Sequence, residues 1–362
     1  MSYEISELNI KDLETIYDLT VFAGLNAGHS KQEWLKTQHW LLLGSQELTG
    51  IESPLGHVMY EGGKIIGYVG YSQRLFKCDG KLFPALVTND LVVHPNHRGL
   101  AGIILCKHTF QCISSGKFPQ KIIGLHNSRA ATALYLALGA GEVRNSGRTL
   151  SAVTSVGNFL SDRLPMLSPV FKGLQILDFF PFVPSFLAKR GKTVVRNGTL
   201  RMKNFSSNDF LASNKYGVRE LLHAFMNTVD TGVVRDLKYL KWRYADHPTR
   251  SFQWYGLLEG EKISALAVAQ KTNHRSTNLC ELFIGPEKSK ESMQDILRAT
   301  LFACGRDGSG FVRSKVITPQ ILEAFREIGI GEEEKEYNQF SVFPPPEKIG
   351  NPIFSYGDNK VL

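Results

Sequence analysis

The stretch VHPNHRGLAGIIL, residues 93–105, joins an apolar, strand-like run to an apolar helix through a basic turn of small residues. Gly99, Ala101 and Gly102 carry little or no side chain, so a ligand can approach the backbone N–H groups that open the following helix. The positive end of the helix dipole and the guanidinium of Arg98 both favour an anion at this place. The stretch therefore predicts either a phosphate-binding turn or a plain connection between a strand and a helix.

The composition is that of a folded protein with an anionic ligand. The chain has 362 residues, 43% of them hydrophobic and 21% charged, and a formal net charge of +8. This length suits two domains, and the charge does not distinguish nucleic acid from a nucleotide, coenzyme A or an acidic membrane face. The five cysteines form no CxxC pair, and the N-terminus lacks a secretion signal. We therefore expect free thiols, no structural zinc or other metal, and a cytoplasmic location.

One apolar segment, GLQILDFFPFVPSFLAKR at 173–190, lies where the strand and helix periodicity stops. Asp178, Pro181 and Pro184 interrupt it, and it is too short to cross about 30 Å of hydrocarbon. No stable membrane insertion is therefore expected. We interpret residues 156–205 as an apolar linker or a substrate lid, with an interfacial membrane contact as a further reading.

The first half of the chain reads as strands followed by alternating helices and strands. Residues 56–93 show the pattern of an antiparallel meander with a Glu-Gly-Gly turn. A helix starting near Gly102 and a short buried strand at 121–125 follow. The next helix is predicted from residues at offsets of three and four, which share one helix face: Asn127, Ala130, Ala131, Leu134, Tyr135 and Leu138.

The second half repeats this order of elements. Residues 237–272 contain a helix or turn rich in aromatic and basic residues, followed by two strands around Glu-Gly-Glu. A third strand, an amphipathic helix, a fourth strand and a helix that begins with proline come next. The sequence GPEKSKES stands where a second Arg-Gly turn would be needed. The second half is therefore predicted to keep the fold without a phosphate turn.

Two motifs of the first half resemble the GNAT superfamily of acyl-coenzyme A transferases. From Arg98 the sequence R-G-L-A-G-I is similar to the family's pyrophosphate loop, Q/R-x-x-G-x-G/A, with Ala101 at the central glycine and Ile103 at the last small residue. Residues 127–140, NSRAATALYLALGA, are similar to the family's N-x-x-A-x-x-L-Y-x-x-x-G-F, with Ala140 in place of phenylalanine.

The resemblance implies a fold class and a division of the chain. The expected class is α/β (α+β), with two tandem GNAT-like domains, each a mixed, mostly antiparallel twisted sheet flanked by helices. The predicted ranges are 1–155 for a domain that binds acyl-coenzyme A, 156–205 for the linker or lid, 206–350 for a degenerate domain that contributes the acceptor site, and 351–362 for a tail.

The resemblance also implies how acyl-coenzyme A, as co-substrate, would lie. Its diphosphate is expected on the Arg-Gly turn, and its pantetheine arm is expected beside the strand that ends at Val93, paired with the strand backbone. Backbone amides of that strand would hold the thioester oxygen as negative charge develops on it. The predicted coenzyme-binding residues are Leu91, Val92, Val93, Arg98, Gly99, Leu100, Ala101, Gly102, Ile103, Asn127 and Ala130.

Acyl transfer to an amine requires an acceptor for the amine proton and a donor for the departing thiolate. The resemblance makes Tyr135 the candidate acid, and the alternative is a tyrosine packed on its helix face. His126 and Asp90 are the candidate bases. The alternatives are a local hydrogen-bonding role for His126 and a solvated strand end for Asp90, and a weakly basic amine needs no side-chain base.

The segment YLKWRY and the following HP, within residues 239–248, resemble tandem GNAT-like proteins of bacterial surface-polysaccharide pathways, such as those for lipopolysaccharide and O-antigen. The resemblance implies a dTDP- or UDP-linked amino sugar as acceptor. The acyl group would be acetyl or a short hydroxyacyl such as 3-hydroxybutanoyl. The predicted acceptor-binding residues are Trp242, Arg243, Tyr244 and His247, whose alternative role is to anchor the second domain.

Two functions of other classes stay open. One is an aminoacyl-tRNA-dependent peptide transferase, which would bind nucleic acid, and the other is a non-catalytic sensor of coenzyme A or a nucleotide. The sequence shows no counterpart of the long helical arm of the transferases, and its basic residues are scattered. We therefore expect no nucleic-acid partner. A homodimer is left open.

Overall fold

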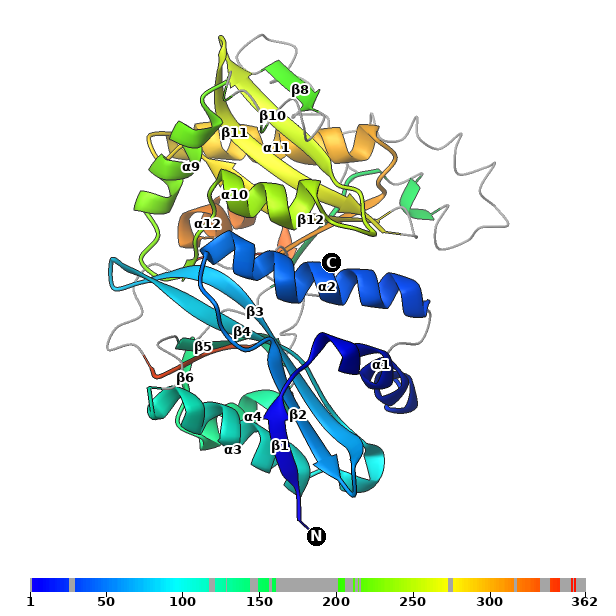
Figure 1. Ribbon diagram of the computed structural model, residues 1–362. Helices are drawn as coiled ribbons and strands as arrows, with labels where there is room; N and C mark the ends of the chain where they lie inside the picture. Colours follow the sequence, from blue (N-terminus) through cyan, green and yellow to red (C-terminus); the bar gives the residue numbers. More distant parts are fainter. Residues whose placement is uncertain are drawn as a thin grey trace. The chain divides into compact units, whose positions relative to one another are not determined.

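The computed structural model describes most of the chain, whose path is drawn in Figure 1. The described residues are 2–25, 30–116, 121–127, 129–143, 149–155, 158–160, 201–205, 211, 214, 216–272, 276–315, 318–332, 339–345, 353 and 355. They divide into two compact units. The first consists of Met1–Ser146, Asp246–Arg250 and Tyr337–Ile349, and the second of Gly147–Ala245, Ser251–Glu336 and Gly350–Leu362.

The first unit contains seven strands of one sheet with helices on both faces. The strands are β1 (Glu4–Glu7), β2 (Gly56–Glu61), β3 (Lys64–Cys78), β4 (Lys81–Val93), β5 (Lys121–Asn127), β6 (Gly141–Val143) and β15 (Gln339–Phe343). The helices are α1 (Leu13–Phe22), α2 (Lys31–Thr49), α3 (Leu100–Ser114) and α4 (Arg129–Ala137), with the 3-10 turns η1 (Ile10–Asp12) and η2 (Pro95–His97). The predicted meander at 56–93 is present as β2, β3 and β4.

These strands lie in the order β1-β2-β3-β4-β5-β15-β6. Neighbouring strands pair antiparallel, except β4 and β5, which are parallel. A parallel pair cannot be joined by a tight hairpin, so the chain leaves β4 and returns to β5 through α3. The quoted stretch at 93–105 is the beginning of this crossover.

Side chains of alternate residues in the central strands pack into two separate hydrophobic cores. Val58 and Tyr68 pack with α1 and α2, whereas their sequence neighbours Met59 and Val69 pack with α3 and α4. Successive side chains of a strand point to opposite faces, so the two pairs of helices cover opposite faces of the sheet. Figure 1 shows α3 and α4 on one side of this sheet, and α2 on the other.

The second unit is built in the same way. Its strands are β7 (Thr149–Val153), β8 (Arg201–Phe205), β9 (Gly232–Val233), β10 (Gln253–Glu259), β11 (Lys262–Lys271), β12 (Ser276–Ile284), β13 (Phe311–Lys315) and β14 (Gly331–Glu332). Its helices are α9 (Val218–Asn227), α10 (Leu237–Leu240), the single π turn η5 (Lys241–Ala245), α11 (Lys290–Arg306) and α12 (Pro319–Glu327).

The sheet of the second unit has the order β14-β7-β13-β12-β11-β10-β8. Strands β10, β11 and β12 form an antiparallel meander, and β12 pairs parallel with β13 after the crossover helix α11. Strand β11 is buried from Ile263 to Gln270 without a break, so both faces of this sheet are covered. The order of elements therefore repeats that of the first unit.

Each sheet contains at least one strand from the other half of the sequence. Strand β7 pairs with β13 in the second unit, and β15 pairs with β5 and β6 in the first. The predicted domain 1–155 includes β7, which pairs in the sheet of the second unit. The predicted domain 206–350 includes β15, which pairs in the sheet of the first unit. The difference arises because pairing depends on hydrogen bonds between distant segments, which the alternation within one strand does not encode.

The predicted linker or lid at 156–205 ends in strand β8, which pairs with β10. The apolar segment at 173–190 and most of the predicted tail lie outside the described residues. Among the helices that the structure describes, none has the length and apolar character needed to cross a bilayer.

Candidate functional site

Strand β4 is bent just before it ends. The register between β3 and β4 shifts after Tyr68 pairs with Val92 and before Gly70 pairs with Asn89, so β4 contains a bulge. Asp90 lies in this bulge with a φ of 47°, a left-handed conformation that costs a non-glycine residue free energy. Its carboxylate accepts a hydrogen bond of 3.1 Å from the Nε2 of Gln38. The predicted base is thus a half-buried carboxylate that also fixes a bent strand.

The pairing of β4 with β5 stops well before either strand ends. The last matched residues are Val87 and Ile123, whereas β4 continues to Val93 and β5 to Asn127. Beyond that point the β5 side of β4 carries no ladder to β5, so its backbone groups can pair with an extended ligand. This stretch contains the predicted pantetheine-binding residues Leu91, Val92 and Val93.

Helix α3 begins without a side-chain cap. Gly99 stands at the N-cap with a φ of 91° and a ψ of −92°, a conformation that favours glycine, and the first intrahelical bond runs from Ile103 N to Gly99 O at 3.1 Å. The amides of Leu100, Ala101 and Gly102 precede that bond and have no partner of the helical kind. They lie in the turn for which the sequence predicts anion binding, and that role stays a prediction.

The residues of this turn differ in their burial. Ala101 is fully buried in the core beneath the helix, whereas Leu100 is 62% exposed and Ile103 45% exposed. A Cβ atom added at Gly99 would meet nothing within 4 Å. Ile103, the largest departure from the family's loop, therefore points outward beside the turn and does not fill the core.

Cationic and aromatic groups gather around the same turn. The exposed guanidinium of Arg98 donates a hydrogen bond of 3.3 Å from Nη2 to the carbonyl of Ala23, at the end of α1. His94 opens η2 and stacks on Phe22, with ring centroids 4.7 Å apart. The Nε2 of His97 lies 3.5 Å from the carboxylate of Glu61.

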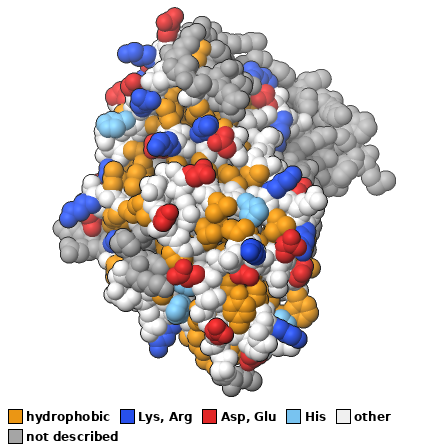
Figure 2. Space-filling view, in the orientation of Figure 1, with side chains coloured by type: hydrophobic (Ala, Val, Ile, Leu, Met, Phe, Trp, Pro, Cys, Tyr) orange, Lys and Arg blue, Asp and Glu red, His pale blue; other side chains and the backbone are white. Residues whose placement is uncertain are grey.

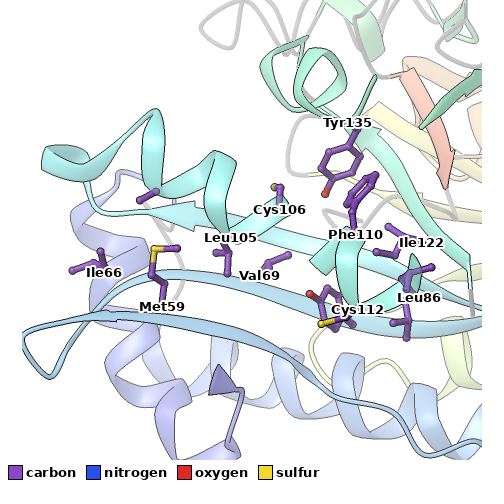
Figure 3. Packing of buried hydrophobic residues seen from close by; sticks show 13 residues of the cluster. Met59, Ile66, Val69, Leu86, Leu105, Cys106, Phe110, Cys112, Ile122 and Tyr135 are labelled. Carbon is purple, nitrogen blue, oxygen red and sulfur yellow. The ribbon is translucent and has the colours of Figure 1, made fainter. Parts of the chain in front are cut away.

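Tyr135 lies on the inner face of α4. It is 3% exposed, and its ring centroid is 5.4 Å from that of Phe110. Figure 3 shows its hydroxyl directed toward Cys106. Burial raises the pKa of Tyr135 well above its usual value, and the nearby Cys106 adds to the rise, whereas a hydrogen bond with Thr88 opposes it. The side chain is thus protonated at neutral pH and remains a hydrogen-bond donor.

The other predicted site residues of the first half lie at the end of β5 and at the start of α4. His126 and Asn127 end β5, and their side chains lie outside the described part of the structure. Ala130 is exposed in the first turn of α4.

The four predicted acceptor residues fall in different units. In the second unit, Trp242, Arg243 and Tyr244 are buried, at 7%, 1% and 2% exposure. The Tyr244 hydroxyl donates to Glu281 Oε1 at 2.7 Å, and the nearby Glu281 adds to the rise that burial causes in the pKa of Tyr244.

In the first unit, His247 lies against Trp40 of α2, with ring centroids 4.4 Å apart. The anchoring alternative is not tested by these contacts, each of which lies within one unit. The acceptor-binding role of the four residues stays a prediction.

Sequence reasoning missed three residues that contact the site. Gln38 donates a hydrogen bond to Asp90, and Thr88 is hydrogen-bonded to Tyr135. The ring of Phe22 stacks on that of His94. Gln38 could have been found from the sequence, because it is a polar residue four positions after Trp34, on the face of the helix that is expected to be buried. Thr88 and Phe22 are ordinary residues for a strand and a helix, and no local pattern singles them out.

No protein-family model and no curated protein sequence matches the chain. Comparison with solved structures finds proteins of similar fold. A GCN5-related N-acetyltransferase from Kribbella flavida aligns with a TM-score of 0.59 at 12% identity, over 94% of this chain and 70% of that one. A GCN5-related N-acetyltransferase from Anabaena variabilis gives 0.58 at 13% identity, over 94% and 72%.

A third solved structure spans both units. The N-myristoyltransferase of Saccharomyces cerevisiae, solved with bound myristoyl-CoA, aligns with a TM-score of 0.55 at 10% identity, over 94% of this chain and 82% of that one. The chain has a tandem GNAT fold. The predicted α/β (α+β) class, with two GNAT-like sheets flanked by helices, is therefore confirmed.

Proposed function

We propose that the chain is an acyl-coenzyme A-dependent N-acyltransferase whose coenzyme site is the start of α3 in the first unit. The observation that carries this proposal is the set of uncapped amides after Gly99, which follow the bulged end of β4. The shared fold adds support, because the yeast N-myristoyltransferase was solved with myristoyl-CoA bound.

The diphosphate of the coenzyme would accept hydrogen bonds from the amides of Leu100, Ala101 and Gly102. These donors are fixed by the helix and point along its axis, so they need no rearrangement to bind an anion. Arg98 would add a charge-assisted bond from its exposed guanidinium. The outward position of Ile103 is compatible with a ligand that lies along the helix start.

The pantetheine arm would extend along β4 where its pairing with β5 has stopped. Backbone groups of Leu91, Val92 and Val93 can pair with the two amides of the arm as they would with another strand. The bulge at Asp90 turns the end of β4, and in the proposed complex a backbone N–H group of this end would face the thioester. An amide aimed at the thioester oxygen stabilises the charge that develops there.

In the reaction, the nitrogen of the acceptor amine attacks the thioester carbonyl, a C–N bond forms, and the C–S bond breaks to release the coenzyme as a thiolate. Tyr135 is the proposed donor to that thiolate, since it stays neutral at pH 7. Asp90 or His126 is the proposed acceptor for the amine proton. Asn127 and Ala130 are assigned to the coenzyme by the motif that they share with the family.

For the acceptor we propose a nucleotide-linked amino sugar, and for the acyl group an acetyl or a short hydroxyacyl. This assignment rests on the resemblance of residues 239–248 to proteins of surface-polysaccharide pathways, and on the net charge of +8, which suits two anionic ligands. On the face shown in Figure 2, Lys and Arg side chains are interspersed with Asp and Glu. Such a surface gives less support to a nucleic-acid partner, which favours a continuous basic stripe.

The proposal is tested by the release of free thiol from acetyl- and 3-hydroxybutanoyl-coenzyme A, with and without dTDP- or UDP-linked amino sugars. The wild type is compared with Tyr135→Phe and with Tyr68→Phe, a matched control that is buried on the opposite face of the same sheet. We expect amine-dependent thiol release that Tyr135→Phe lowers about 10²- to 10⁴-fold, whereas Tyr68→Phe retains it.

Coenzyme binding without thiol release from any acyl donor would favour the sensor instead. Release that does not depend on an amino sugar would refute the proposed acceptor.

A further inference from the structure

Three side chains with metal-binding atoms meet in the first unit, on the face of the sheet that α3 covers. They are His57 on β2 and His108 and Cys112 on α3. One ring nitrogen of each histidine and the Sγ of Cys112 all lie within 4.8 Å of one another. His108 and Cys112 are four residues apart on a helix, so they share one face of it.

The spacing of these atoms fits a tetrahedral metal. The His108 Nε2 and the Cys112 Sγ are 3.6 Å apart. Zinc binds sulfur at about 2.3 Å and nitrogen at about 2.0–2.1 Å, and a tetrahedral angle then separates the two ligand atoms by about 3.5 Å. The pair therefore needs almost no movement to chelate zinc, and His57 needs only a small approach.

A chain of hydrogen bonds places the ring proton of His57 on Nδ1 and leaves Nε2 as the nitrogen that could bind a metal ion. Thr109 donates to the carbonyl of Leu105 at 3.1 Å, which uses its only proton. With the Thr109 proton on Leu105, Tyr71 donates the 2.6 Å bond to Thr109, and Thr109 Oγ1, which also lies 3.4 Å from His57 Nδ1, acts there as an acceptor. Tyr71 therefore accepts in its 2.7 Å bond with His57, whose Nδ1 carries the hydrogen.

This arrangement leaves the other nitrogen of His57 in the form that can bind a metal ion. A neutral imidazole protonated at Nδ1 has its lone pair at Nε2, the form that metal-binding histidines adopt when an outer group holds the N–H. Tyr71 is the group that holds it here, and Thr109 in turn holds Tyr71. The outer support of a metal site is thus already built into the core.

The site is enclosed on one side and reachable on the other. His57 is 1% exposed and Cys112 is 7% exposed, and Cys112 packs within the apolar cluster shown in Figure 3. His108 is only half-buried, so a metal ion can enter past it. The sequence predicts no metal because it has no CxxC pair, but the spacing His-x-x-x-Cys at 108–112 presents two ligands on a helix without one.

We propose that His57 Nε2, His108 Nε2 and Cys112 Sγ bind one zinc ion, with a fourth position open to water. The donor set of two nitrogens and one sulfur is one that zinc prefers. The site lies on side chains that the coenzyme turn does not use, so it stands independently of the proposed acyltransferase. Its role would be to tie β2 to α3, because no step of the acyl transfer requires it.

The test uses the full chain, freed of metal with a chelator and then titrated with Zn²⁺ in equilibrium dialysis. Co²⁺ serves as a second probe, because a bound thiolate gives it a charge-transfer absorption. Cys112→Ser and His108→Ala remove one ligand each, and Tyr71→Phe removes the group that orients His57. Cys106→Ser is the matched control, a buried cysteine on the same helix outside the cluster.

We expect one zinc ion per chain, a thiolate-to-cobalt absorption band and a zinc-dependent rise in melting temperature. Cys112→Ser and His108→Ala should each lower the affinity at least 100-fold, Tyr71→Phe should lower it about 10- to 100-fold, and Cys106→Ser should leave it unchanged. Melting curves in chelator show whether each variant is folded. Wild-type protein that binds no zinc, or folded Cys112→Ser and His108→Ala variants that bind it as the wild type does, would overturn the assignment.

Discussion

Replacing Arg98 by alanine is expected to weaken the binding of coenzyme A while leaving the fold intact. The guanidinium is exposed, and the hydrogen bond that it donates to Ala23 is 3.3 Å long. Loss of such a surface contact changes the free energy of unfolding by no more than about 0.5 kcal/mol. The side chain lies beside the helix start that would hold the diphosphate, so its removal acts on the ligand.

The size of the effect follows from the kind of bond that is lost. A hydrogen bond to a charged group contributes about 1.5–3 kcal/mol, and 1.4 kcal/mol corresponds to a tenfold change in affinity. The dissociation constant of coenzyme A should therefore rise about 10- to 150-fold in Arg98→Ala. Arg98→Lys should fall between the two proteins, because lysine keeps the charge and loses the planar fork.

Isothermal titration with coenzyme A at fixed ionic strength measures these constants. Lys107→Ala is the control, because Lys107 is an exposed cation on the same helix α3 and its removal changes the net charge equally. The control should bind as the wild type does. Equal losses in Arg98→Ala and Lys107→Ala would show that only overall charge matters, and an unchanged affinity in Arg98→Ala would refute the assignment of the turn.

Three further predictions concern stability, measured by urea unfolding. Burial raises the pKa of the Cys106 thiol from 9.0 to about 12. The neutral thiol therefore stabilises the fold below pH 9, and this contribution to the free energy of unfolding is lost as the pH rises from 9 toward 12. The free energy of unfolding of Cys106→Ala should fall less steeply over this pH range, and a slope equal to that of the wild type would contradict the prediction. Glu281→Ala should destabilise by about 3–5 kcal/mol, because it leaves Arg235 buried without its partner at 3.0 Å; a loss under 1 kcal/mol would contradict the pairing. Ser30→Ala removes the capping box with Glu33 at the start of α2 and should cost about 0.5–2 kcal/mol, and no change would mean that the cap contributes nothing.

Most elements of the fold could be predicted from the sequence, because each has a strong local pattern. Alternation gives the meander at 56–93, and the small residues after Arg98 mark the start of α3. The bulge at Asp90 could not be predicted, although aspartate tolerates positive φ better than most residues do. Its conformation is selected by the register with β3 and by the hydrogen bond from Gln38, both of which are long-range.

The site was predictable only where its function depends on the backbone. The turn at 99–102 is proposed to bind its ligand through backbone amides, so its small side chains and its place before a helix suffice to single it out. Side-chain clusters are different. The buried group at Trp242, Arg243 and Tyr244 has the residue types of a ligand site, but its environment depends on distant partners such as Glu281. No spacing within the sequence reveals those partners.

The proposed function depends above all on a diphosphate that binds the uncapped amides at the start of α3. A crystal structure of the chain with coenzyme A tests it most directly. We expect diphosphate oxygens within hydrogen-bond distance of the backbone nitrogens of Leu100, Ala101 and Gly102, with the pantetheine arm along Leu91–Val93. Coenzyme A bound only within the second unit, or a diphosphate kept away from these amides by Ile103, would contradict it.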